Sequence, residues 1–256
     1  MLAAVRRVGR FSLDYTQRVG RFTLFILSSL ALALLPPWRP RRVLAETYFI
    51  GFSSLLIIGL TAAFTGMVLG LQGYYTLRKF GAESALGSAV ALSLIRELGP
   101  VLTALMVSGR AGSAITAEIG IMRITEQLDA LDTMAVHPVQ YVVSPKMVAG
   151  LISVPLLTAI FDVVGILGGY AVGVGLLGVS SGSYFSGMIQ SVVNLDVKGG
   201  VVKSLVFGLI VTGVACYNGY YTERGAEGVS RATTHTVVTS AVLVLGWDYI
   251  LTSFFM

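Results

Sequence analysis

The chain has little of what disulfide-rich proteins and metalloenzymes require: one cysteine (Cys216) and two histidines in 256 residues, with charged residues at only 12% of positions. A single cysteine excludes a disulfide framework. His137 and His235 lie far apart and no HxxxH or CxxC spacing occurs, so we expect no metal site. The sequence also lacks Walker A, HExxH and G-x-S-x-G motifs. We therefore expect neither nucleotide binding nor catalysis by this chain.

Apolar residues dominate instead. They make up 55% of the chain, the mean hydropathy is +0.80, and there are 30 glycines. A soluble domain of this length could not bury so much apolar surface, whereas glycines let transmembrane helices approach closely. The composition predicts an all-α integral membrane protein.

Five apolar segments are long enough to cross a hydrocarbon core of about 30 Å. The predicted spans are approximately residues 48–77, 84–109, 147–179, 201–221 and 236–256. Gly66 and Gly70 in the first span, and Gly165, Gly169 and Gly173 in the third, form small-residue seams suited to close helix contact. We expect a loop with a short helix over 180–200, and a tight turn over 225–234 in which Thr233 or Thr234 caps the fifth span.

Residues 1–42 form a basic leader. Its apolar residues recur at helical spacing along one face, and several of its arginines lie on the other face. Its apolar part, Phe22–Leu35, would be only about 21 Å long as a helix, too short to span. A signal peptide is one interpretation, because Ala31-Leu32-Ala33 resembles a cleavage site. The arginines that follow would resist translocation (Arg39, Arg41 and Arg42). We favour an uncleaved interfacial or half-inserted amphipathic helix.

The distribution of basic residues predicts the orientation. With the N-terminus inside, 13 Lys and Arg residues fall on the cytoplasmic side, eight of them before Val43. Only four fall on the outer side (Arg78, Lys79, Lys198 and Lys203). The positive-inside rule therefore predicts a cytoplasmic N-terminus and an outer C-terminus.

A cytoplasmic amphipathic helix is predicted between the second and third spans, over residues 114–135. Its apolar stripe is Ile121, Ile124, Leu128 and Leu131, and its charged stripe is Arg123, Glu126, Asp129 and Asp132. Such a helix either lies on the bilayer or docks a partner protein. The net acidic stripe favours docking, because anionic lipid would repel it.

Arg96 and Glu97 stand side by side in Ser84–Gly109, a stretch of 26 residues that is otherwise uncharged. A charge at the bilayer centre costs about 2.5–3.5 kcal/mol, so such residues normally face a polar cavity or a partner. Neighbours in a helix point about 100° apart, so the two side chains should bind different partners. The candidate partners are Asp162 in the third span and Asp248 in the fifth. These two aspartates either pack or hydrogen-bond within the bundle, which is the interpretation that we favour, or carry protons.

Six segments resemble the MlaE family of ABC-transporter permeases, and the likeness runs from about residue 45 to the end. They are Gly66–Gly73 (GMVLGLQG), Leu94–Leu102 (LIRELGPVL), Gly109–Ala114 (GRAGSA), Ala117–Gly120 (AEIG), Thr125–Leu131 (TEQLDAL) and Gly225–Thr234 (GAEGVSRATT). The resemblance implies a permease domain over 43–256, after a leader over 1–42.

In function, the resemblance implies a homodimeric permease in the inner membrane of a Gram-negative bacterium. It would move phospholipids between inner and outer membranes and maintain outer-membrane lipid asymmetry. Its implied partners are a cytoplasmic ABC ATPase that binds ATP and Mg²⁺, a STAS-domain subunit and a hexameric periplasmic ring of MCE domains. No cofactor is implied for this chain.

The resemblance also implies site residues. Leu69, Thr76, Leu77 and Phe80 would line a lipid cavity with Arg96 and Glu97 near its base. Family relatives often carry Val at position 76 and Tyr at position 80, so this chain departs from the pattern at the rim. Residues 114–135 would be the helix that couples to the ATPase, through Arg123, Ile124, Glu126, Gln127, Leu128, Asp129 and Leu131.

Two alternatives stay open. The Arg96–Glu97 pair either belongs to a structural ion network between helices or shapes the lipid site. An ion-coupled secondary carrier could use Arg96, Glu97, Asp162 and Asp248 as a relay, although five spans without a visible inverted repeat argue against it.

Overall fold

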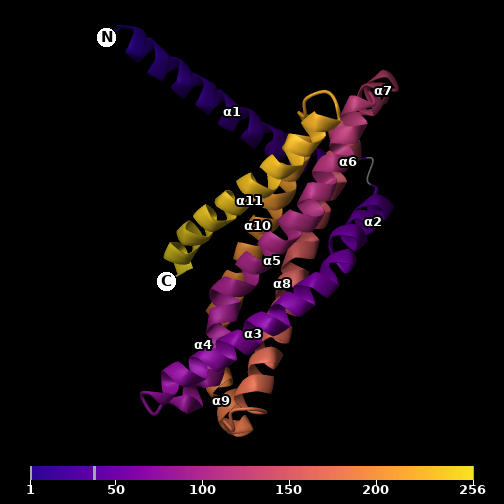
Figure 1. Cartoon of the computed structure of the whole chain (residues 1–256). Helices are drawn as coiled ribbons and strands as arrows, with labels where there is room; N and C mark the ends of the chain where they lie inside the picture. Colours follow the sequence, from indigo (N-terminus) through magenta and orange to yellow (C-terminus); the bar gives the residue numbers. More distant parts are fainter. Residues whose placement is uncertain (1, 37–38, 256) are drawn as a thin grey trace.

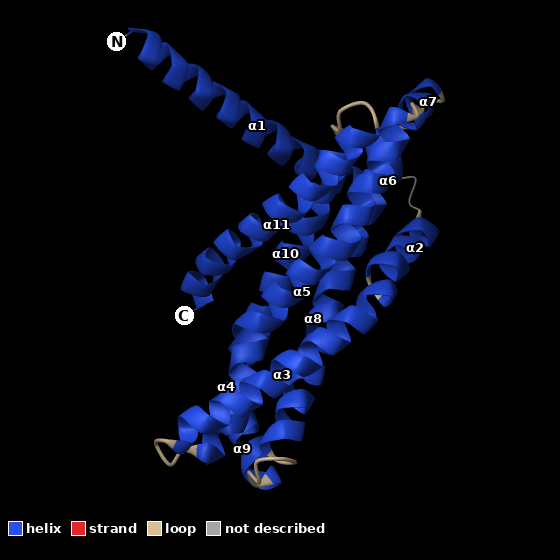
Figure 2. Cartoon of the chain, viewed as in Figure 1, coloured by secondary structure: helices blue, strands red, loops and turns tan. Residues whose placement is uncertain are grey.

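The computed structural model describes residues 2–36 and 39–255, with side chains from Thr16 onward except Arg18. None of the residues so described lies in a β-strand, and five helices are long and apolar enough to cross a membrane (Figure 2). Helices suit the bilayer because each satisfies its own backbone hydrogen bonds. The predicted all-α membrane architecture with five spans is confirmed.

Helix α1 (Leu2–Leu34) precedes the spans. The first span consists of α2 (Pro40–Ile50), η1 (Phe52–Ser54) and α3 (Leu55–Arg78). The second consists of η2 (Glu83–Ala85), α4 (Leu86–Ser93), η3 (Leu94–Leu98), α5 (Gly99–Val107), η4 (Ser108–Gly112) and α6 (Ser113–Ile124). After α7 (Gln127–Thr133), the third consists of η5 (Val139–Val143) and α8 (Ser144–Gly173). The rest of the chain forms α9 (Ser181–Ser191), α10 (Asn194–Tyr220) and α11 (Ala226–Phe255).

The short helices mark the two ends of the bundle. Helix α7 lies at one end, with the connection between α10 and α11, and α9 lies at the other, with the connection between α3 and α4 (Figure 1). We call these the α7 end and the α9 end. Helix α1 leaves the bundle obliquely at the α7 end. Phe25 anchors its second half, with ring centroids 5.6 Å from those of Tyr217 and Tyr220.

The two predicted glycine seams meet. Helix α3 packs along α8, and a Cβ added at Gly66 would overlap the carbonyl oxygen of Gly165. One turn further along, a Cβ at Gly70 would lie 2.9 Å from the carbonyl oxygen of Gly169. The two backbones are therefore in direct contact, which only residues without side chains allow.

The prediction of one helix over 114–135 is wrong. Residues Ser113–Ile124 continue the second span as α6, and α7 begins only after Glu126, whose φ of 59° is left-handed. The Thr125 hydroxyl donates to the Ile121 carbonyl oxygen (2.8 Å) at the end of α6. Because of the break, Ile121 is exposed while Leu128 is buried, so the predicted apolar residues do not form one stripe.

Several helices also begin or end away from the predicted span boundaries. Helix α11 begins at Ala226, after Gly225 turns the chain with a φ of 94°, and Glu227 pairs with Arg231 in its first turns (2.6 Å). The hydroxyls of Thr233 and Thr234 bond to the Ser230 carbonyl oxygen inside this helix, so they do not cap it. Hydropathy marks the apolar part of a helix, whereas local ion pairs and turns set its ends.

The first, second and fourth spans likewise begin before their predicted starts, at Pro40, Glu83 and Asn194. Helix α8 ends at Gly173, before the predicted residue 179. The two faces predicted for the leader depend on side chains before Thr16, which lie outside the described residues. Its interfacial position and the orientation of the chain stay predictions.

Candidate functional site: a buried charge cluster at the Pro100 bend

The second span carries a π-turn at the predicted polar spot. Arg96 and Glu97 lie in η3, which closes with a hydrogen bond from the Gly99 N–H to the Leu94 carbonyl oxygen. Pro100 follows and has no N–H, so the Arg96 carbonyl oxygen four residues earlier lacks its usual i→i−4 donor. π-turns of this kind are frequent at functional sites because they re-aim side chains and free backbone groups.

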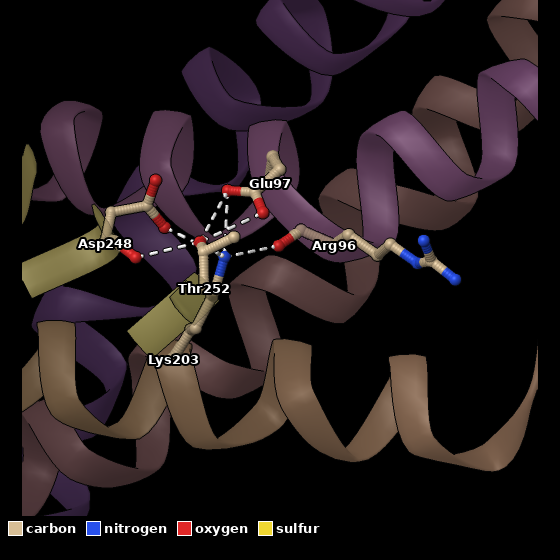
Figure 3. A network of polar contacts seen from close by, with 5 residues as sticks. All are labelled: Arg96, Glu97, Lys203, Asp248 and Thr252. Carbon is tan, nitrogen blue, oxygen red and sulfur yellow. Dashed lines mark hydrogen bonds and ion pairs between the residues drawn. The ribbon is translucent and has the colours of Figure 1, made fainter. Parts of the chain in front are cut away.

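Lys203 of α10 supplies the missing donor. Its ammonium nitrogen lies 2.8 Å from the Arg96 carbonyl oxygen, and only 3% of its side chain is exposed. The same ammonium contacts Glu97 Oε2 (2.8 Å), Thr252 Oγ1 (2.7 Å) and Asp248 Oδ1 (3.0 Å). Figure 3 shows these groups converging on the nitrogen of Lys203, which extends from α10, with Arg96 and Glu97 coming from η3 and Asp248 and Thr252 from α11. We call Glu97, Lys203, Asp248 and Thr252 the Lys203 cluster.

Arg96 points away from this cluster (Figure 3). Its Nε donates to Asp196 Oδ1 at 2.8 Å, and the other oxygen of Asp196 accepts the Val193 N–H at 3.0 Å. Arg96 and Glu97 therefore bind different partners, which confirms that part of the prediction. The predicted partners are wrong for Arg96. Asp248 lies near Glu97, and both contact Lys203 and Thr252.

A pocket of about 270 Å³ opens beside these groups. Its lining has polar residues and an apolar part: Arg96, Glu97, Asp196, Lys203 and Thr252, with Val193, Leu195, Gly199, Gly200 and Phe255. When every group is ionised, the two cations and the carboxylates of Glu97, Asp196 and Asp248 leave a net charge of −1. Among the described residues no cluster fits a metal ion.

Asp162 takes no part in the cluster. It lies on α8 against the second span, where a Cβ at Gly99 would overlap its carboxylate. It lines a separate, mostly apolar pocket of about 220 Å³ between η3, α8 and α10. Its Oδ1 is buried and has no hydrogen-bond partner among the described residues. Asp162 and Asp248, which we predicted to act similarly, are thus in different surroundings.

The other residues of the predicted lipid cavity lie elsewhere. Leu69, Thr76, Leu77 and Phe80 follow α3 toward the α9 end, and none of them lines the pocket beside Arg96. Leu69 and Leu77 pack partly against the core, whereas Thr76 and Phe80 are exposed. A single chain therefore does not bring the two parts of the predicted cavity together.

The predicted coupling residues divide between α6 and α7. Arg123 closes the break between the helices by pairing with Asp129 (2.7 Å), and Leu128 anchors α7 with 1% of its surface exposed. Ile124 and Leu131 are partly buried, whereas Glu126 and Gln127 are exposed. This α7 end of the bundle thus presents charged residues above an apolar anchor.

Sequence reasoning missed three members of the site: Lys203, Asp196 and Thr252. Lys203 stands near the start of the predicted fourth span, and the charge count placed it on the outer side. Pro100 could have pointed to such a residue. A proline inside a span leaves the carbonyl oxygen four residues earlier without its usual donor, and inside a membrane another helix has to supply one.

Known proteins support the assignment of this fold. Residues 43–254 match the family model described as Permease MlaE. The chain is 46% identical over 252 residues to the intermembrane phospholipid transport system permease protein MlaE of Haemophilus influenzae, covering 97% of this chain and 96% of that protein. It is 43% identical over 255 residues to a probable ABC transporter permease protein of Rickettsia bellii, covering 100% and 98%.

A plant protein is also similar. The chloroplastic protein trigalactosyldiacylglycerol 1 of Arabidopsis thaliana is 33% identical over 215 residues, which are 84% of this chain and 61% of that protein. The family model covers all five spans apart from a few terminal residues. The chain therefore belongs to the MlaE permease family and is a multi-pass membrane protein.

Proposed function

We propose that the chain is the membrane subunit of an ABC transporter that moves phospholipids between the inner and outer membranes of a Gram-negative bacterium, which would maintain outer-membrane lipid asymmetry. Membership of the MlaE family and the name of the Haemophilus relative support this proposal. Because the sequence has no Walker motif, ATP and Mg²⁺ would be bound by a separate ATPase subunit.

The pocket beside Arg96 is the observation on which the proposed class of substrate, a phospholipid, depends. Lys203 already contacts four acceptors, whereas the terminal amino groups of Arg96 have no partner among the described residues and 37% of its side chain is exposed. A guanidinium binds phosphate oxygens strongly. Glu97, partly exposed beside it, already accepts hydrogen bonds from Lys203 and Thr252, and its remaining carboxylate lone pairs can accept from an ammonium. Together they match a headgroup that carries both charges, while the apolar residues face its glycerol and acyl part.

The volume fits a headgroup and leaves the acyl chains outside. We propose that two copies of the chain enclose them, with Leu69, Thr76, Leu77 and Phe80 of each copy on the cavity wall. Helix α3 supports this because it leaves large apolar side chains such as Phe64 and Val68 exposed. A homodimer would cover part of this face, and lipid would cover the rest.

The remaining partners would bind at the ends of the bundle. The ATPase and its STAS-domain subunit would contact the α7 end, and an MCE-domain ring would cover the α9 end. Both assignments rest on the family resemblance and on the predicted orientation. The chain itself would carry no cofactor.

Purification from cells that express all subunits tests the assembly. We expect the chain to co-purify with an ATPase, and Leu128→Asp to abolish this, because a carboxylate at the buried anchor of α7 would displace the helix. Leu176→Asp, an exposed position beyond α8 at the opposite end of the bundle, is the control and should retain the ATPase. If Leu128→Asp retains the ATPase, α7 is not the docking element.

Reconstitution into liposomes tests the substrate. Arg96→Ala should lower ATP-dependent phospholipid transfer about tenfold, the equivalent of 1.4 kcal/mol, while the complex still assembles. Glu97→Lys should also impair transport, but it would set a second ammonium against Lys203 and is a less specific test. Transfer driven by a proton gradient without the ATPase would refute the proposal in favour of an ion-coupled carrier.

A further inference from the structure

A second buried lysine lies outside the site described so far. Lys146, in the first turns of α8, has only 2% of its side chain exposed. Its ammonium lies 2.7 Å from Glu46 Oε1 of α2 and 2.8 Å from Glu118 Oε2 of α6. A buried ammonium is stable only when it is paired, and here two other spans supply the carboxylates. One side chain thus connects three of the five spans.

The helices that Lys146 connects belong to two different packing groups. Helices α2 and α3 pack along α8, and α6 packs along α10 and α11. Helix α10 also packs along α8 and so links the two groups, while α6 itself makes little direct contact with α2 or α8. Within the described part of the chain, the pairs made by Lys146 are the only ion pairs that join α2, α6 and α8. Lys146 therefore reaches across a boundary between helix groups.

Space remains beside this connection. A pocket of about 260 Å³ lies between α2, α6 and the start of α8, and its lining includes Arg42, Glu46, Glu118 and Lys146. The side chain of Glu118 is 50% exposed. Tightly packed interiors resist displacement, whereas a bridge beside an open pocket can change length or angle. The α6 side of the connection has this freedom.

The α2 side is held by a second contact. Arg42 Nη1 donates to the Tyr141 carbonyl oxygen at 3.1 Å, and its guanidinium lies 3.5 Å from the centroid of the Tyr141 ring. Pro145 stands four residues after Tyr141, so this carbonyl oxygen lacks a helical donor as the Arg96 oxygen does. Helix α2 is therefore fixed to the start of α8. Arg110, just before α6, holds the other end of α2 by donating to the Phe49 carbonyl oxygen (2.8 Å). Any displacement relative to α2 and α8 is therefore left to α6 itself, which begins beyond Arg110 and carries Glu118.

We propose that Lys146 is a positioning residue that transmits movement of α6 and α7 to the unit formed by α2, α3 and α8. This inference rests on the proposed function, in which a partner ATPase pushes on α7. Displacement of α7 would pass along α6 to Glu118, and through Lys146 to Glu46 and the first span. The same unit contains α3, whose residues would line the lipid cavity.

Glu118→Ala tests the inference with the least damage, because Lys146 keeps Glu46 as its counter-ion. In the purified complex, reconstituted into liposomes, we expect assembly and ATP hydrolysis to stay within about twofold of the unmodified complex. Phospholipid transferred per ATP hydrolysed should fall at least about fivefold, the lower range of typical coupling between sites. Lys146→Met should give the same loss, and Glu223→Ala, an exposed carboxylate at the same end, should give none.

The ratio of lipid to ATP separates coupling from a structural role. If Glu118→Ala leaves this ratio unchanged, the inference is wrong. This holds if phospholipid transfer and ATP hydrolysis both stay normal, and it also holds if both fall together with the melting temperature. If unmodified protein transfers no phospholipid with its ATPase, the proposed function itself fails. A second variant, Glu118→Gln, should restore part of the ratio, because its amide oxygen can still accept a hydrogen bond from Lys146.

Discussion

Replacing Lys203 by methionine tests the buried charge cluster directly. Methionine keeps most of the apolar stem and removes the ammonium, so Glu97 and Asp248 lose the cation between them. The Arg96 carbonyl oxygen loses the donor that substitutes for the missing N–H of Pro100. The variant therefore leaves two carboxylates and one carbonyl oxygen unpaired inside the bundle.

The expected cost follows from burial. Removing one partner of a fully buried ion pair costs about 3–5 kcal/mol. Glu97 and Asp248 keep some solvent access, with 34% and 19% of their side chains exposed. We therefore expect Lys203→Met to lower the free energy of unfolding by about 3 kcal/mol. Adding Glu97→Gln removes one of the two carboxylates and should recover about half of this loss.

The assay is equilibrium unfolding of the purified chain in mild detergent, titrated with dodecyl sulfate and followed by circular dichroism. The two single variants, the double variant and the unmodified chain form a double-mutant cycle, for which we expect a coupling of at least about 1.5 kcal/mol. Lys198→Met, an exposed position on the same helix, is the control. If the single costs add within about 0.5 kcal/mol, Lys203 and Glu97 do not interact and the description of the cluster is wrong.

Two further predictions concern the α3–α8 seam and the α9 end. Gly66→Ala should destabilise the chain by at least about 2 kcal/mol, because its Cβ meets the opposing backbone, whereas Gly59→Ala on the same helix meets no atom within 4 Å and should be neutral in the same titration. Tyr184→Phe should cost about 1 kcal/mol, because the hydroxyl donates to the Ile166 carbonyl oxygen (3.1 Å). Burial raises the pKa of the Tyr184 hydroxyl from 10.0 to about 12. Its stabilisation should hold below pH 10 and be lost as the pH rises toward 12, and a cost that is independent of pH over this range would contradict the assignment.

Patterns of single residue types predicted the parts of the fold that depend on local composition. Apolar runs gave the five spans because the bilayer requires long apolar helices. Glycines four residues apart predicted small-residue seams on the first and third spans, because small residues let helix backbones approach closely. That the two seams contact each other was not predicted. Adjacent charges at positions 96 and 97 gave two separate partners because helical geometry sets their directions.

Features that depend on contacts between distant segments were not predictable. Lys203 and Glu97 are 106 positions apart, so neither charge counting nor helical periodicity relates them. The sequence alone does not distinguish a lysine at the boundary of an apolar run that faces water from one that faces a buried carboxylate. The break at Glu126 also escaped the analysis, because the apolar spacing continues across it while the backbone does not.

The glycine seam has a consequence for how the molecule can change shape. Where backbone atoms touch, no side chain can change rotamer to allow one helix to slide along the other. Helices α3 and α8 should therefore move together as one rigid unit, which we call the α3–α8 spine. Any opening and closing then falls to the helices outside that spine. Helix α11 is the least covered of the five, and its far end carries Asp248 and Thr252. Movement of α11 would change the distances from Asp248 and Thr252 to the Lys203 ammonium.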